Sequence, residues 1–163
     1  MSVSAHIFPE LQQETGTKTL QLATDALFVL LIATGTFTFG ATPYTYTTVS
    51  QFLAGDGSNG AVVEVSTSGT AYTRQALGGV SLTTTGLVTT LTCSNPSWAA
   101  STISAKYAVW YAGGAGGSGV SANDATTNKL MAYWDFGGAQ ASSAGTFTLQ
   151  VNASGLLTFT ASL

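Results

Sequence analysis

Carboxylates are the most numerous side chains in this sequence that could take part in acid–base chemistry. General acid–base catalysis needs a pair of titratable groups whose pKa values are driven apart. Two of the aspartates lie in the turn-like stretches AGDGSNG and SANDATTN, where aspartate stabilises turns through its own backbone. Glu64 and Asp135 lie in strand-like stretches, where Arg74 or Lys106 can pair with either. The seven carboxylates therefore predict structural contacts and no catalytic pair; they are Glu10, Glu14, Asp25, Asp56, Glu64, Asp124 and Asp135.

Nucleophilic catalysis and metal binding lack their usual partners. The chain has one histidine, His6, and one cysteine, Cys93. A catalytic thiol or serine needs a histidine base, and His6 lies close to one end of the sequence. We expect Cys93 to be a small buried hydrophobe. The stretch GDGSNG, Gly55–Gly60, clusters oxygens like a calcium loop but has one carboxylate and no closing glutamate. We therefore expect no catalytic residue, no metal site and no cofactor.

The segment WYAGGAGGSGVS, Trp110–Ser121, has the glycine content of a phosphate-binding loop. Such a loop leads into the N-terminus of a helix and usually contains a lysine. Here turn residues and a second strand-like stretch follow, and the next lysine, Lys129, begins that strand. We interpret residues 113–128 as a long hairpin loop, which is either exposed to solvent or packed between subunits.

An aromatic cluster occupies the two strands that this loop joins. Neighbouring residues of a strand point to opposite faces, so half of the cluster is expected to face a core. Core packing is the expected role, and an exposed stripe that binds carbohydrate is the alternative. The cluster consists of Tyr107, Trp110, Tyr111, Tyr133, Trp134 and Phe136.

The chain carries little charge. Only 7% of its 163 residues are charged, against about 25% in a typical soluble domain. Four basic and seven acidic residues cannot build the basic footprint that nucleic acid requires. The sequence contains 27 threonines instead. This composition favours a surface that lies against another protein, and its length suits one domain with a real core.

Apolar–polar alternation predicts strands over most of the chain, and helix signals are few. We expect strands at Ala26–Ala33, 35–49, Val62–Thr67, on both sides of Gly86 within Gly78–Ser94, at Thr102–Ala112, Lys129–Gly137, Thr146–Val151 and Leu156–Thr160, the last two joined by a tight Asn-Ala-Ser-Gly turn. Short helices are expected within Pro9–Leu22, and at Thr48–Ala54 with Thr48 as the cap and Gly55 as the stop. The pattern predicts a mainly β fold: a single antiparallel β-sandwich or barrel, jelly-roll-like or immunoglobulin-like, with one or two short helices and an N-terminal arm.

The first 20 residues differ from the rest in being helical or irregular. They form either an arm that reaches a neighbouring molecule or the first edge of the fold, and residues 21–163 form the β-sandwich domain. The N-terminus shows neither the basic nor the apolar region of a secretory signal. The longest apolar run, Ala26–Ala33, is shorter than the roughly 20 residues of a membrane helix. We therefore expect no membrane partner.

Several segments together resemble a family of small tailed-bacteriophage virion structural proteins. They follow one another in the family's order and span roughly residues 25–160. The segments are QFLAGDGSNGAVVEVSTSGTAYTR (Gln51–Arg74), LGGVSLT (Leu77–Thr83), PSWAASTISAKYAVWY (Pro96–Tyr111) and MAYWDFGGAQASSAGTFTLQVNASGLLTF (Met131–Phe159). The N-terminal 20 residues and the glycine-rich loop depart from the family pattern.

The resemblance implies a virion component without catalysis. The expected role is decoration or cementing on the outer surface of the head, with the major capsid protein as partner; a tail or fibre protein, or a receptor- or carbohydrate-binding module, is the alternative. A homo-oligomer, with a trimer favoured, is expected. Trp98 is implied as a core or interface anchor, and Arg74 and Asp135 as ion-pair or backbone-binding groups. The candidate interface residues are His6, Phe8, Trp98, Gly113, Gly114, Gly116 and Gly117.

Overall fold

The computed structural model describes residues 4–16, 21–33, 46–55, 62–113 and 128–160. These residues form antiparallel strands and two short helices, which confirms the mainly β fold. The helices are α1 (Pro9–Gly16) and α2 (Val49–Ala54). The strands are β1 (Ser4–Ile7), β2 (Leu27–Ala33), β3 (Gln75–Ala76), β4 (Ser81–Thr85), β5 (Val88–Thr92), β6 (Ser97–Ser101), β7 (Ser104–Ala112), β8 (Lys129–Ala141), β9 (Gly145–Thr148) and β10 (Leu157–Thr160).

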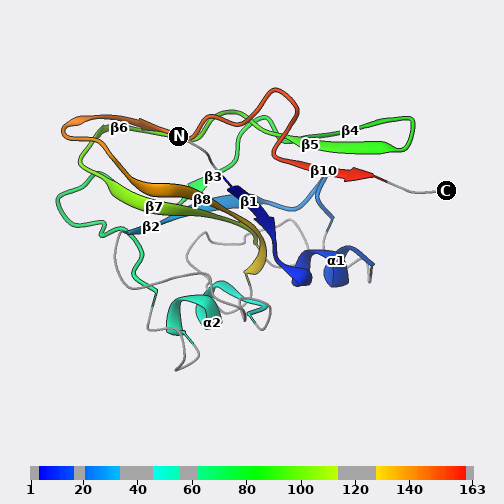
Figure 1. Cartoon of the computed structure of the whole chain (residues 1–163), viewed down its shortest axis with the longest axis horizontal. Helices are drawn as coiled ribbons and strands as arrows, with labels where there is room; N and C mark the ends of the chain where they lie inside the picture. Colours follow the sequence, from blue (N-terminus) through cyan, green and yellow to red (C-terminus); the bar gives the residue numbers. More distant parts are fainter. Residues whose placement is uncertain (1–3, 17–20, 34–45, 56–61, 114–127, 161–163) are drawn as a thin grey trace.

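The strands lie in two layers, as in a sandwich (Figure 1). A five-stranded sheet of order β1-β8-β7-β2-β3 forms the central layer. Above it in Figure 1 lie a three-stranded sheet, β10-β5-β4, and the pair β6-β9, while the two helices lie below. The described strands do not close into a barrel, because the central sheet ends at β1 on one side and at β3 on the other.

The middle of the central sheet is buried on both faces, which explains the unbroken apolar sequence of β2. One face packs Val29, Leu31 and Trp110 against residues of the upper layer such as Leu91. The opposite face packs another set of side chains against α2, through Val49 and Phe52, and against Phe8. A strand covered on both sides needs apolar residues at every position rather than at alternate ones.

The N-terminal strand β1 forms one edge of the protein's own central sheet, as in the edge alternative, and α1 follows it. β1 pairs with β8 in register Ser4↔Asp135 to Ile7↔Ala132. Phe8 and Leu11, after β1, are fully buried in the two core clusters. Pro9 begins α1, as its fixed φ and missing N–H predict.

Helix α2 begins and ends where the sequence predicts. The Thr48 hydroxyl accepts a hydrogen bond from the Gln51 backbone N–H at 3.3 Å, and the Gln51 side chain accepts from the Thr48 N–H at 3.3 Å. This reciprocal capping box satisfies two N–H groups that have no partner inside the helix. Gly55 ends the helix with φ of 72°.

Two of the predicted hairpins are present. β4 and β5 pair from Ser81↔Thr92 to Thr85↔Val88 around a two-residue turn in which Gly86 has φ of 60°. That positive φ at the first turn position is what a tight hairpin requires and glycine supplies. β7 and β8 also pair antiparallel, and β8 continues four residues beyond the predicted end at Gly137.

Two strand predictions are wrong, the first in the existence of a strand and the second in its pairing. The segment Val62–Thr67 makes a single bridge, Glu64↔Ile32, because the chain only touches the end of β2 before turning away. The two C-terminal strands, joined by the predicted tight turn, do not pair with each other. β9 pairs with β6 and β10 pairs with β5. The predicted strand at 35–49 lies mostly outside the described residues.

The turn before β10 depends on Gly155. Its φ is +100°, and a Cβ at this position would lie 2.3 Å from Thr90 Cγ2 and 2.8 Å from the Leu91 carbonyl oxygen. We expect Gly155→Ala to lower the free energy of unfolding by about 2 kcal/mol, through overlap with backbone and a strained φ. Gly86→Ala is the control, since nothing lies within 4 Å of its Cβ, and only the positive φ costs about 1 kcal/mol. Equal costs in urea unfolding of the two variants would contradict the steric argument.

Candidate functional site

Each described carboxylate side chain accepts a hydrogen bond from a backbone N–H or pairs with a basic side chain. Asp25 accepts a hydrogen bond from the Gln21 N–H at 2.6 Å, and Asp135 accepts from the Gly137 N–H at 2.8 Å. Glu10 pairs with Lys129 at 3.1 Å. These contacts agree with the structural role that the sequence predicts. Within the described part of the chain, no group of three His, Cys, Asp or Glu residues could hold a metal ion.

The most elaborate polar cluster is formed by Glu64, Arg74 and Tyr72. Arg74 donates two hydrogen bonds to Glu64, from Nε to Oε1 at 2.9 Å and from Nη2 to Oε2 at 2.7 Å. Tyr72 donates its hydroxyl proton to Glu64 Oε1 at 2.8 Å and accepts from the Leu31 N–H at 2.9 Å. The Glu64–Arg74 pair is one of those that the sequence allows; the other basic candidate, Lys106, lies with Nζ 5.0 Å from the Tyr107 ring centroid. The cluster ties the segment before β3 to the end of β2.

Burial in this region disfavours tyrosinate. Desolvation, followed by the nearby Glu64 charge, raises the pKa of Tyr72 far above its ordinary value of 10.0. Desolvation also raises the pKa of Tyr111 to about 12, against a smaller lowering effect of Arg74. The Arg74 pKa is raised chiefly by its hydrogen bonds to Glu64, so the guanidinium stays charged. Neither Tyr72 nor Arg74 therefore exchanges a proton near neutral pH.

Because of these tyrosines, we expect the free energy of unfolding to fall at alkaline pH. An unfolded tyrosine ionises near 10, whereas Tyr111 holds its proton to about 12 when folded. The folded state therefore binds the proton more tightly. The resulting contribution to the free energy of unfolding is complete below pH 10 and is lost as pH rises toward 12. We expect a loss of about 2 kcal/mol across that range from Tyr111 alone. Urea titrations at successive pH values check this, and Tyr111→Phe should reduce the slope to the part that Tyr72 contributes; an unchanged slope in that variant would contradict it.

The aromatic cluster on β7 and β8 is buried on both faces of the sheet. Tyr107 and Tyr111 pack in one core, and Trp110, Trp134 and Phe136 pack in the other. The most exposed of the six, Trp134, retains 8% of its surface. Core packing is therefore confirmed, and the exposed carbohydrate stripe on this hairpin is wrong, because Phe8 and α2 cover the face that carries Tyr107 and Tyr111.

The predicted interface residues fall into three groups. Phe8 and Trp98 are buried in this chain's own core, so their side chains are not available to a partner. His6 is exposed on β1 and stacks on Tyr133, with ring centroids 4.7 Å apart. Gly113 is buried, and its N–H donates to the Ala26 carbonyl at 2.8 Å. The predictions for Gly114, Gly116 and Gly117, for the calcium-like Gly55–Gly60 loop beyond Gly55, and for Asp56 and Asp124 lie outside the described residues.

Cys93 is half-buried at the end of β5 and packs against the upper core, close to the expected buried position. Burial raises the pKa of its thiol. A raised pKa lowers the thiolate fraction at neutral pH, and thiolate is the reactive form. Cys93 is therefore a packing residue.

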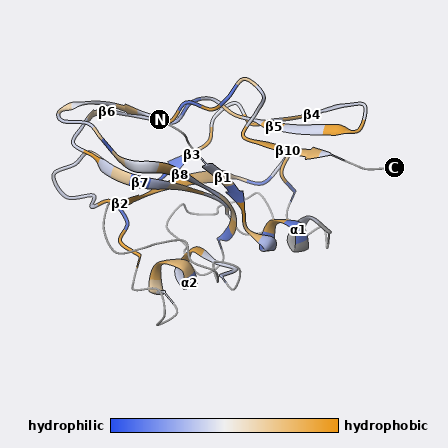
Figure 2. Ribbon diagram, in the orientation of Figure 1, coloured by the Kyte–Doolittle hydropathy of each residue, from blue (hydrophilic) through white to orange (hydrophobic). Residues whose placement is uncertain are grey.

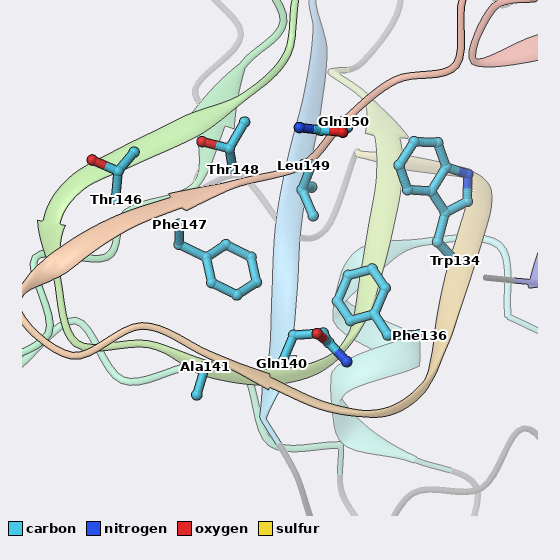
Figure 3. A pocket seen from close by; sticks show the side chains of 9 residues that line it. All are labelled: Trp134, Phe136, Gln140, Ala141, Thr146, Phe147, Thr148, Leu149 and Gln150. Atoms are coloured by element: carbon cyan, nitrogen blue, oxygen red, sulfur yellow. The ribbon is translucent and has the colours of Figure 1, made fainter. Parts of the chain in front are cut away.

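A groove lies between the end of β8 and β9 (Figure 3). It encloses about 360 Å³. Phe147 and Leu149 point down from the upper layer toward Phe136, while Thr146 and Thr148 point away (Figure 3). The full lining is Trp134, Phe136, Gln140, Ala141, Thr146, Phe147, Thr148, Leu149 and Gln150. The groove thus has an apolar floor and neutral polar walls.

A second groove, of about 610 Å³, continues from the first and shares Trp134 and Gln150 with it. It runs along Gln150–Ala153 toward Ala5 of β1. Among the described residues, none that lines either groove carries a charge. An uncharged, mainly apolar groove suits a neutral segment of another protein, because a charge placed there would lose its hydration without gaining a counterion.

The grooves could not be found from the sequence. Their lining comes from the end of β8, from β9 and from the segment after it, which the sequence predicts as strands but not as the two sides of one opening. The only local signal is the alternation TFTLQ, Thr146–Gln150, which places Phe147 and Leu149 on the same side.

Comparisons with known proteins return no match: no family model, no curated protein and no solved structure is similar to this chain at a significant level. Among the helices that the structure describes, none has the length and apolar character needed to cross a membrane.

Proposed function

We propose that this chain is a non-enzymatic structural protein of a tailed-bacteriophage virion. Its place is the outer surface of the head, where it binds the major capsid protein and stabilises the shell. The proposal rests on the four segments that resemble a family of such proteins, and on one observation about the surface described next.

The observation is an uncharged outer face on the β10-β5-β4 sheet. Paired residues share a face, so Thr158, Thr90 and Thr83 stand in one row across the three strands. Thr160, Val88 and Thr85 form the next row on the same face. No strand of this sheet contains an ionisable residue. Such a face can approach another neutral protein surface without desolvating charge.

The carboxylates support the same proposal from the chemical side. Glu10, Asp25, Glu64 and Asp135 are each engaged in holding the fold. Catalysis by proton transfer needs a group in reach of substrate with a pKa near the working pH. The described carboxylates instead stabilise the fold, which is the role expected of them in a structural protein of a shell.

Shells stripped of decoration test the proposal. Adding the purified protein should raise the melting temperature of stripped heads, because a ligand that binds only the assembled shell stabilises it. The outer-face variant Thr90→Glu with Thr158→Glu should lose this effect, and Ser143→Glu, on an exposed turn elsewhere, should keep it. Gold-labelled antibody on whole virions then separates head from tail. Heads that neither bind the protein nor gain stability would refute the proposal.

A further inference from the structure

Strand β4 is an unprotected sheet edge. Among the described strands it pairs with β5 alone, and all five of its residues, Ser81–Thr85, are exposed. Native proteins block such edges with a lysine, a proline or a bulge, because the free N–H and C=O groups pair readily with another strand. β4 contains no charge and no proline, and its register with β5 is uninterrupted. This edge is therefore open to strand pairing.

Leu82 gives the open edge an apolar side chain that its own chain covers only in part, beside a hollow that Thr15, Leu22, Thr89 and Phe159 also line. It lies in one row with Leu91 and Leu157, which are buried at 0% and 6% exposure. Leu82 itself is 40% exposed. Its neighbours in the row face the core, so Leu82 points toward the same side of the sheet. Figure 2 shows the hydrophobic colouring at the end of the β4–β5 hairpin, where Leu87 is also exposed.

Strand β9 has the complementary features. Among the described strands it pairs with β6 alone, so its other edge is open. The Leu149 N–H donates to the Pro96 carbonyl beside β6. Because successive residues of a strand direct their backbone groups to opposite sides, those of Thr148 and Gln150 point to the open edge. The apolar groove over Trp134 and Phe136 lies beneath that edge.

We propose that β4 of one copy pairs with the open edge of β9 of a neighbouring copy. Leu82 then covers the groove above Trp134, and Ser81 and Thr83 face outward. The choice of a second copy follows from charge and shape. The groove is lined by neutral residues, and β4 is a neutral extended segment with one apolar side chain directed to the required side.

A symmetric pairing of β4 with β4 fits less well. Centred on Thr83, it places Leu82 opposite Thr84 of the other copy and leaves the groove beside β9 uncovered. The β4–β9 contact uses different surfaces on the two copies, so it propagates from copy to copy and closes into a ring when the rotation allows. The inference rests on the proposed assembly role and names the contact that would build the expected oligomer.

Sedimentation velocity of the full chain, without capsids, tests this contact. We expect a concentration-dependent oligomer for the native sequence. We call β4 the donor strand and the open edge of β9 the acceptor edge. Leu82→Lys should prevent β4 from binding over the groove. Thr148→Pro should block the acceptor edge without loss of a hydrogen bond to β6. Each variant alone should be monomeric. Their equimolar mixture should form a dimer, because one retains the acceptor and the other retains the donor. Leu87→Lys and Thr148→Ala are the matched controls and should assemble like the native chain.

The mixture also reports folding, since two misfolded variants could not restore a dimer. A native chain that stays monomeric at high micromolar concentration would overturn the inference. So would a mixture that remains monomeric, or a Thr148→Pro variant that assembles normally. A native chain that is monomeric but still stabilises heads would refute this contact and leave the proposed function intact. An oligomer that does not bind heads would support this contact and refute the proposed function.

Discussion

Trp98→Ala should lower the free energy of unfolding of the isolated protein by about 3–5 kcal/mol. Trp98 is 2% exposed and lies between Tyr72 and Phe147, with ring centroids 5.9 and 6.0 Å away. It therefore joins the segment before β3 to β9. Its Nε1–H donates to the Thr73 carbonyl at 2.7 Å. Truncation leaves a cavity and an unpaired carbonyl, and both costs arise in the monomer.

Chemical denaturation followed by circular dichroism measures this cost. Trp98→Phe should lose about 1–2 kcal/mol, because it keeps much of the packing and removes only the hydrogen bond. Ser97→Ala, at the exposed neighbouring position of β6, should stay within about 0.5 kcal/mol of the native chain. If Trp98→Ala were as stable as Ser97→Ala, Trp98 would not be a core anchor.

Glu64→Ala should cost about 3 kcal/mol, the low end of the range for breaking a buried ion pair. The low end applies because the two side chains are 11% and 21% exposed, so water partly screens them. The variant leaves the Arg74 charge without its two hydrogen bonds and removes the acceptor of the Tyr72 hydroxyl. The segment that Tyr72 anchors to Leu31 of β2 should then loosen.

A double-mutant cycle with Arg74→Met isolates the pair. We expect a coupling energy of about 1–3 kcal/mol between Glu64 and Arg74. Asp135→Asn is the control carboxylate, since its oxygen accepts from the Gly137 N–H at an exposed site within β8, and its cost should stay below about 1 kcal/mol. Additive costs in the cycle would show that the ion pair contributes nothing to stability.

The sequence predicts the parts of this fold that depend on neighbours in the chain. Thr48 and Gln51 set the start of α2, Gly86 sets the β4–β5 turn, and Pro9 sets the start of α1. Each is a local effect of φ or of a side chain bonding to a backbone group a few residues away. The two-residue repeat of strand geometry likewise fixes which residues of β4 and β5 share a face.

The parts that could not be predicted depend on long-range partners. Nothing in the sequence of β9 indicates that it pairs with β6 rather than with β10. The aromatic residues of β7 and β8 alternate between two faces, and only the position of the helices decides that both faces are buried. The groove beside Trp134 follows from the same cause, because it is the opening left where β8 and β9 join different sheets.

A weak contact between copies is consistent with a shell protein. The edge of a five-residue strand buries less area than the about 1,200–2,000 Å² of a stable interface. On a repeating lattice, however, each copy is held by several contacts at once, and linked contacts raise the overall affinity without stronger individual ones. The uncharged threonine face and the β4 edge would then act together.

A single-particle reconstruction of the virion whose genome encodes this chain tests the proposed function most directly. We predict density on the outer surface of the head, repeated at equivalent capsid positions, into which the two-layered β fold fits with the β10-β5-β4 sheet toward the shell. A head surface without such density, or the same fold found in the tail, would contradict the account.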